Sequence, residues 1–385
     1  MSCPSLRSAR FVGLGRAGLV LGIMVNISIL IGCNGQYIDR YNSGKSMWIG
    51  TLTARTRLTT CKVYIPCMWH DPDSYAEARM PDWTDEALRY FETNPTAIYA
   101  ESELVNVLSE RRVDWTVPRS VEFPCFVRTM MRRRALKRIS IRRATISDTP
   151  VRHRAQSDSS EELHADRGTV VRYSANEPSV LRVALSLRVG AYLSHATAMS
   201  LHGLIARPSG TVYVNKEQTP KPRPGSITQT ALDTAFRRPP RVSRDAYRYR
   251  KAKFLLLSGK QTGRLGVIEI PDAAGGRISV TGLERSLVDA VVRPVYAGGA
   301  LQVLRAYRAA KSRCSVGAIL EILMKLEHVY PYHQAIGFYM QRAGYSADDL
   351  KRFRALGLNF DFYLEHGMAQ TEYDSSWRLY YPAGM

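Results

Sequence analysis

The stretch that decides the fold is residues 123–142, which read FPCFVRTMMRRRALKRISIR. Its apolar side chains recur at the spacing of one helical face, and they are Phe123, Phe126, Val127, Met130 and Met131. The polar side chains between them fall on the other side of the helix, and they are Arg128, Thr129, Arg132 and Arg133. Proline fits only the first turn of a helix, so Pro124 predicts a helix that begins near Glu122 and runs to about Arg134.

A basic strand is predicted directly after this helix. Ile139 and Ile141 alternate with polar residues over 137–142, which is typical of a strand with both isoleucines inward. Residues 143–168 are polar and predict a wing tip or a flexible loop, and residues 169–173 predict the returning strand.

Two further helices are expected upstream. The first covers 85–91 with one apolar face of Ala87, Leu88 and Phe91, and the second covers 101–111 with Leu104, Val105 and Leu108 inward. Three helices followed by a basic strand are the order of a winged helix-turn-helix, which we predict over 81–175.

The distribution of charge points to a polyanionic partner. The chain has 54 Lys and Arg against 34 Asp and Glu, a net charge of +20. The charge is densest over 128–154, where Asp148 is the only acid among ten cations: Arg128, Arg132, Arg133, Arg134, Lys137, Arg138, Arg142, Arg143, Arg152 and Arg154. A solvated charge run is the alternative, but these cations share one helix face and the adjoining strand, with an apolar stripe behind them. We therefore predict that this region binds double-stranded DNA.

Different members of the basic region are expected to have different roles. Those near the helix start are predicted to touch bases, and they are Arg119, Ser120 and Glu122. Those along the helix are predicted to meet the major-groove edge and its phosphates: Arg128, Thr129, Arg132 and Arg133. Those on the strand are predicted to meet the DNA backbone: Lys137, Arg138, Arg142 and Arg143.

Residues 176–385 are predicted to form a larger mixed α/β domain, so the fold class is α+β. Helices are expected over 180–189, 195–202, 283–292, 299–311 and 316–326. Strands are expected over 211–214, 254–257, 266–270 and 277–280, without strict βαβ alternation. The segment SGKQTG, 258–263, lacks the upstream glycine of a phosphate loop and predicts a hairpin turn.

Residues 192–204, YLSHATAMSLHGL, predict a capped helix. Ser194 suits the N-cap, because its hydroxyl accepts a backbone N–H, and Gly203 suits the position after the C-cap. His195 and His202 invite a metal-site interpretation, but their spacing of seven is not that of a ligand pair on a helix. We expect packed or capping histidines.

Residues 280–299, VTGLERSLVDAVVRPVYAGG, predict a helix with a capping box of Thr281 and Glu284. Arg285 and Asp289 stand four residues apart, where they can form an ion pair. A catalytic carboxylate pair is the alternative, although the segment offers no metal-ligand set and no nucleophile. The aromatic-rich stretch YPYHQAIGFYMQRAGY, 330–345, predicts a contribution to the core rather than a base-stacking surface.

The N-terminal 80 residues form a poorly defined extension. Arginines precede an apolar run over 17–31 that ends shortly before Cys33, as in a bacterial lipoprotein signal. A buried segment, or translation from upstream of the true start, is the alternative. The six cysteines form no C-x-x-C pair, so we expect reduced thiols, a cytoplasmic protein, and neither metal nor cofactor.

Taken in order, the stretches at 192–204, 280–299 and 330–345 resemble the AbiEi antitoxins of type IV toxin–antitoxin systems. The likeness extends over roughly 97–385, while the first 80 residues and the long polar wing loop depart from it. The resemblance implies a winged helix that represses its own operon and a C-terminal domain that counteracts a nucleotidyltransferase toxin without a stable complex. It implies no enzymatic activity. Glu284, Arg285 and Asp289 are the antitoxin-domain candidates.

The sequence is also compatible with two other functions. The first is a metal-dependent enzyme that processes nucleic acid, with Asp289, Asp361 or Glu365 binding the metal. The second is a lipid-anchored exported protein, which is the one case in which a membrane partner is expected.

Overall fold

The structure, a computed structural model, describes residues 53–56, 59–62, 82–144, 168–206, 210–220 and 225–385. The chain divides into two compact units, Met1–Arg79 and Met80–Met385. In the first unit, β1 (Thr53–Thr56) pairs antiparallel with β2 (Thr59–Lys62). The lipoprotein-like segment over 17–33 lies outside the described residues, and so do Arg152 and Arg154.

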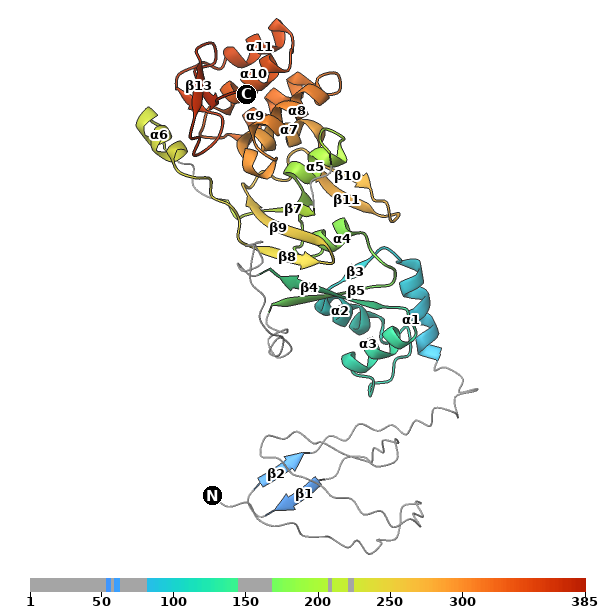
Figure 1. Cartoon of the computed structure of the whole chain (residues 1–385). Coiled ribbons are helices and arrows are strands. Elements are labelled where there is room, and N and C mark those ends of the chain that lie inside the picture. Colours follow the sequence, from blue (N-terminus) through green and yellow to red (C-terminus); the bar gives the residue numbers. More distant parts are fainter. Residues whose placement is uncertain (1–52, 57–58, 63–81, 145–167, 207–209, 221–224) are drawn as a thin grey trace, which may run out of the picture. The chain divides into compact units, whose positions relative to one another are not determined.

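The second unit begins with three helices, which are α1 (Asp82–Thr93), α2 (Glu101–Arg111) and α3 (Phe123–Arg132) (Figure 1). The bounds of α2 are those predicted, whereas α1 starts three residues earlier than expected. Trp83 explains the difference, because it is buried and its ring lies 6.2 Å from that of Phe126 on α3. Phe126 also lies against Phe91 and stacks on Trp115, so α3 is fixed by an aromatic core.

The apolar stripe of α3 is narrower than predicted. Phe126, Val127 and Met130 are buried, but Met131 is 38% exposed. Val105 on α2, also predicted to face inward, is 39% exposed. Both predictions were wrong for the same reason: a short helix packed on one side buries only the residues on its line of contact, and neighbouring positions turn 100° away from it.

Helix α3 ends two residues before the predicted end. The backbone N–H of Arg133 donates to Thr129 O at 2.9 Å, that of Arg134 donates to Met131 O at 3.0 Å, and that of Ala135 donates to Met130 O at 2.9 Å. Arg134 has φ +60°, a left-handed conformation that costs a side-chain-bearing residue about 1 kcal/mol and that glycine adopts freely.

We therefore expect Arg134→Gly to stabilise the protein by about 1 kcal/mol through relief of this strain. Arg134→Ala is the matched control, because it removes the same charge and keeps the strain. Urea unfolding of both variants measures the difference. If glycine gives no more stability than alanine, the left-handed turn after α3 is not strained.

After α3 the chain forms a hairpin. Strand β4 (Lys137–Arg143) pairs antiparallel with β5 (Thr169–Ser174), and β5 pairs with the short β3 (Ile98–Tyr99). Ile139 and Ile141 are buried, as predicted, and the returning strand is where the sequence placed it.

The other edge of β4 is occupied as well. Arg142 and Arg143 pair with Arg248 and Tyr247 of β8 (Ala246–Tyr249), and Ala144 N–H donates to Ala246 O at 2.8 Å. The hairpin is thereby built into a nine-stranded sheet with the order β10-β11-β6-β7-β9-β8-β4-β5-β3. This sheet crosses the boundary predicted between 175 and 176, and the fold class is mixed α+β.

Two short helices accompany the remaining strands of this sheet. In chain order they are α4 (Val180–Leu185), β6 (Tyr192–Leu193), α5 (His195–Leu201), β7 (Thr211–Glu217), β9 (Ala252–Gly259), β10 (Val267–Pro271) and β11 (Arg277–Thr281). Helix α4 is shorter than the predicted 180–189. The prediction of a hairpin turn over 258–263 was wrong, because β7, β6 and β11 lie between β9 and β10 in the sheet.

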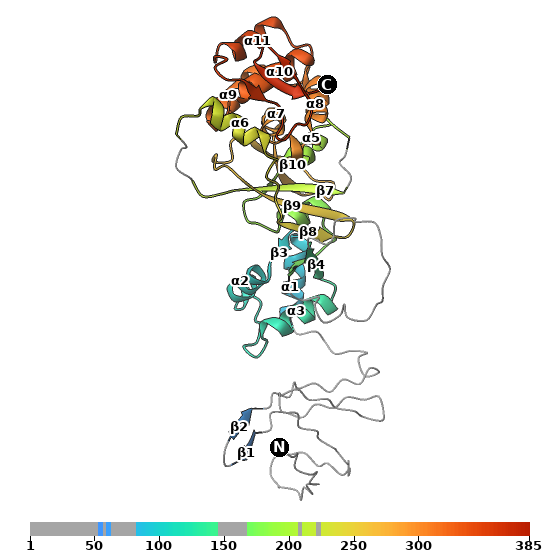
Figure 2. The same ribbon diagram turned by 60° about the vertical axis from the view of Figure 1, so that its left-hand side comes forward.

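The C-terminal helices form a second large core (Figure 2). They are α6 (Gln229–Arg237), α7 (Leu283–Val292), α8 (Ala300–Ala310), α9 (Val316–Leu326), α10 (Tyr332–Arg342) and α11 (Ala347–Arg354), with a 3-10 turn at Pro294–Tyr296. A three-stranded sheet packs with them: β12 (Phe362–Tyr363), β13 (Thr371–Asp374) and β14 (Leu379–Pro382). Helices α7 and α9 have the predicted bounds. The aromatic stretch at 330–345 is core, as predicted, and forms most of α10.

Among the described residues, no helix combines the length and the apolar character that crossing a bilayer requires.

Candidate nucleic-acid interface

The outward face of α3 is basic and exposed. Arg128, Arg132 and Arg133 are exposed, while Thr129 is half-buried. No ion pair with an acid in the described part of the chain neutralises these three arginines. The face opposite them is the buried stripe of Phe126, Val127 and Met130. Helix α3 therefore presents exposed positive charge from a rigid support, and no acid of the described ranges pairs with it.

The loop that leads into α3 is held in place by one side chain. Arg112 donates through Nη1 to Pro118 O at 2.8 Å and through Nη2 to Val121 O at 2.9 Å. Arg119 and Ser120 lie between these two anchor points, and both are exposed. Glu122 is exposed at the N-cap of α3. The residues predicted to touch bases thus lie on a braced loop at the helix start.

The register of the hairpin divides its four cations between two faces. Arg138 and Arg142 lie opposite Tyr173 and Thr169 of β5. Tyr173 packs into the core of α1–α3, and paired residues point to the same side of a sheet. Arg138 and Arg142 are therefore on the face that carries the three helices.

Lys137 and Arg143 lie on the opposite face, with Ile139 and Ile141. Arg143 Nη2 also lies 3.7 Å from Asp245 Oδ1, so its charge is partly matched within the protein. Arg128, Arg132 and Arg133 thus share the outward face of α3, Arg138 and Arg142 lie on the helix side of the hairpin, and Lys137 and Arg143 lie on its other side.

Two cations that sequence reasoning missed extend the helix-side face. Arg142 is the direct partner of Arg248 on β8, and Arg248 is in turn the partner of Lys253 on β9. Like charges directly opposite each other disfavour strand pairing. The alternation of aromatic and basic residues in AYRY, 246–249, was the available signal.

In the second half, Arg285 and Asp289 form the predicted ion pair. Arg285 Nε donates to Asp289 Oδ1 at 2.8 Å, and the side chains are only 6% and 13% exposed. Arg285 Nη1 donates to Leu265 O at 2.6 Å, which ties α7 to the loop before β10. Burial by itself would lower the pKa of Arg285, but the Asp289 carboxylate raises it above its usual value.

The predicted capping box of α7 was wrong. Gly282 is the N-cap, and Thr281 belongs to β11, where its Oγ1 lies 2.8 Å from Ser286 Oγ. Glu284 instead accepts a hydrogen bond from Ser315 N–H at 3.0 Å, at the start of α9. The three antitoxin-domain candidates therefore hold α7 against its neighbours.

The two histidines of the 192–204 stretch are packed separately, as expected. His202 Nε2 lies 2.7 Å from Thr281 O, and Gly203 has φ +68° after the helix. His195 is 8% exposed beside the rings of Tyr213 and Tyr296. Ser194 does not cap α5 through its side chain, because its Oγ lies 2.8 Å from His195 Nδ1.

Burial lowers the pKa of His195 from 6.5 to about 4. Between these values the unfolded chain binds a proton at this position and the folded chain does not. We therefore expect folding stability to fall as the pH drops from 6.5 to 4, by up to about 3 kcal/mol from this group. His195→Asn tolerates the positive φ of this position and should flatten that pH dependence in urea titrations. An unchanged profile would assign the effect to other groups.

The carboxylates of the enzymatic alternative have structural partners. Asp361 binds Arg378 through two contacts of 3.0 Å and accepts from Tyr373 Oη at 2.6 Å. Glu365 Oε1 accepts from Ala300 N–H at 2.5 Å, at the start of α8. Asp289 is paired with Arg285. Within the ranges that the structure covers, no three His, Cys, Asp or Glu side chains gather as metal ligands.

No family model and no curated protein matches the chain. Among solved structures, one described as the crystal structure of RV2827C protein from Mycobacterium tuberculosis is similar, with 14% sequence identity and a TM-score of 0.44. The match covers 80% of this chain and 93% of that one.

Proposed function

We propose that the chain is a DNA-binding antitoxin and transcriptional autorepressor of a type IV toxin–antitoxin operon. In this proposal α1–α3 and the β4–β5 hairpin form a winged helix, and α3 lies in the major groove. The observation that carries the DNA-binding part is the basic face of α3, which is exposed over a buried aromatic core and pairs with no acid in the described ranges.

Each role follows from the position of the side chain. Arg119 and Ser120, on the braced loop, would approach base edges, and Arg128, Arg132 and Arg133 would meet phosphates along the groove. Arg138 and Arg142 would continue these contacts on the hairpin face. Each phosphate that a cation neutralises releases condensed counterions, so binding should weaken steeply as salt is raised.

The antitoxin part of the proposal is supported by the resemblance over 97–385. The partner would be a nucleotidyltransferase toxin in the cytoplasm, counteracted without a stable complex. Because the side chains of Arg285 and Asp289 are only 6% and 13% exposed, they would serve this role by shaping the domain surface rather than by contacting a partner.

Gel-shift titration of the full chain on its own promoter tests DNA binding. We expect specific binding, with a logarithm of the association constant that falls linearly with the logarithm of the salt concentration. An inverted repeat in the bound site would indicate two copies of the protein. Co-expression with the neighbouring nucleotidyltransferase tests the antitoxin part. If the full chain binds its promoter but does not rescue cells from the toxin, it is a repressor and the antitoxin part of the proposal is wrong. If the full chain does not bind its promoter, the repressor part of the proposal is wrong.

A further inference from the structure

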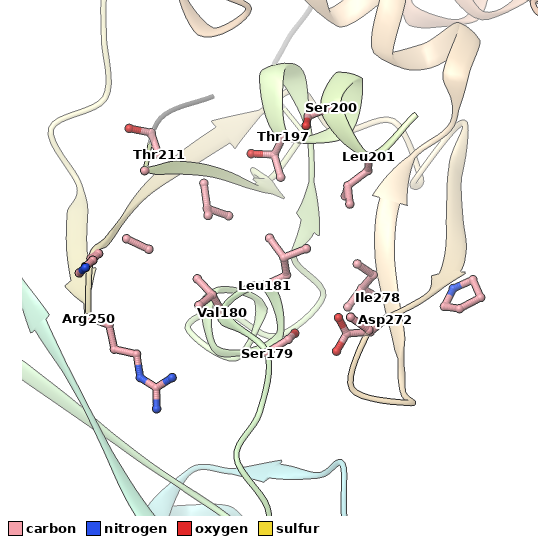
Figure 3. Close-up of a pocket in the computed structure, with 16 residues that line it drawn as sticks. Ser179, Val180, Leu181, Thr197, Ser200, Leu201, Thr211, Arg250, Asp272 and Ile278 are labelled. Atoms are coloured by element: carbon pink, nitrogen blue, oxygen red, sulfur yellow. The ribbon is translucent and has the colours of Figure 1, made fainter. Parts of the chain in front are cut away.

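A cavity of about 840 Å³ lies between α4, α5 and the large sheet (Figure 3). Its walls are mainly apolar, and they are supplied by Val180, Leu181, Leu201, Val212 and Ile278. Cavities of several hundred cubic ångströms with apolar walls and a few polar groups are typical small-molecule sites. The described residues that line this cavity include none from α3, so ligand binding here and DNA binding by α3 can be tested separately.

The acid in the cavity wall is not a binding group. Asp272 is 8% exposed in the turn between β10 and β11, and its Oδ2 atom is buried. Burial lowers the pKa of Arg182 on α4, and the Asp272 carboxylate opposes this shift, so the two charges act on each other. Nη1 of Arg182 is buried as well. This side of the cavity therefore attracts neither a cation nor an anion strongly.

The cations of the cavity lie on the opposite side. In Figure 3, Asp272 and Ile278 lie on one side of the cavity, and Thr211 and Arg250 lie on the other. Arg250 and Lys251 form the turn between β8 and β9, and both are exposed and line the cavity. An occupant with a charged end therefore meets two cations at this turn.

Of these two cations, Lys251 is the one available to an occupant. Arg250 pairs with Glu177, and both side chains of that pair are more than half exposed, so water screens the pair. Lys251 forms no ion pair with an acid of the described ranges. The turn between β8 and β9 therefore favours a negatively charged group.

The turn is held against the neighbouring strand. Lys253 N–H donates to Gly210 O at 2.7 Å, directly before Thr211, which is the first residue of β7. The Thr211 hydroxyl lies on the same side of the cavity as the turn and can donate a hydrogen bond. A hydroxyl and an ammonium are thus placed together at one end of an apolar cavity.

We propose that this cavity binds an apolar carboxylic acid in its ionised form, such as a medium-chain fatty acid. The hydrocarbon chain lies against the apolar residues of α4 and α5. The carboxylate lies at the turn between β8 and β9, where it accepts from the Lys251 ammonium and the Thr211 hydroxyl. Each further CH₂ group that the walls take up from water should raise the affinity about fourfold.

Calorimetric titration of the full chain with octanoate, decanoate and decylamine tests the proposal, because the three probes separate chain length from charge. We expect saturable binding of decanoate, about fifteenfold tighter than that of octanoate, since two further CH₂ groups are buried. Decylamine has the same chain with the opposite charge, and it should bind at least about tenfold more weakly than decanoate. Absence of decanoate binding, or equal affinities for decanoate and decylamine, would overturn the proposal.

Two variants test the position of the ligand. Lys251→Gln changes an exposed turn residue and should weaken decanoate binding about tenfold, through loss of a charge-assisted hydrogen bond. Ser200→Trp fills the cavity from α5 and should abolish binding. Lys351→Gln on α11 is the control for the net charge of +20, because it removes the same charge from an exposed position and should leave the affinity unchanged. Unchanged decanoate affinity in either Lys251→Gln or Ser200→Trp would also overturn the proposal.

Discussion

Arg132→Ala together with Arg133→Ala is expected to weaken promoter binding and to flatten its salt dependence. Both side chains are exposed on α3 and unpaired by acids in the described ranges. Each lost phosphate contact removes about 0.9 from the slope of log K against log salt, so the double variant should lose about 2. Because neither side chain is buried, the thermal stability should stay close to that of the wild type.

The control for this experiment carries the same loss of charge elsewhere. Arg305 and Arg308 are exposed on α8, in the C-terminal core region, and their double alanine variant should keep the wild-type slope. If the α3 variant also keeps that slope, Arg132 and Arg133 do not contact DNA, and the orientation proposed for α3 is wrong.

Asp289→Ala should produce the largest loss of stability. It leaves the Arg285 guanidinium buried without its carboxylate partner, and removing one member of a buried pair costs about 3–5 kcal/mol. Asp289→Asn, which keeps a hydrogen-bond acceptor at the same place, should cost less. Urea titration monitored by circular dichroism measures both free energies of unfolding.

The matched control is Glu321→Gln on α9. Glu321 and Lys325 have the same spacing of four residues, but both side chains are more than half exposed, so this substitution should leave the unfolding midpoint unchanged. Similar effects of Asp289→Ala and Glu321→Gln would mean that water reaches Arg285 and that the pair does not anchor α7.

Helices that carry their own periodic signal in the sequence were predicted correctly. Helices α2, α7 and α9 have the predicted bounds, and the buried stripe of α3 was placed correctly except for its margin at Met131. In each case the apolar spacing within one helix determines which side faces the core.

Features that depend on a partner elsewhere in the fold were not predicted from the sequence. The four-residue strand β8 pairs with β4, about one hundred residues away in the chain, and no local pattern marks that pairing. The capping box at Thr281 failed because the residue belongs to a strand and its hydroxyl is used by Ser286. Nothing in the sequence predicts that Asp272 is buried, because aspartate is common in exposed turns and its burial depends on the fold.

The pairing of β4 with β8 bears on how the basic region can be isolated. A fragment that stops after β5 would expose the backbone N–H and C=O groups along the edge of β4, which the intact chain covers over Arg142–Ala144. Such an unpaired strand edge is a template for pairing with another chain. The three-helix segment is therefore not a freely transplantable module, and fusions that carry it alone would self-associate unless β8 is supplied with it.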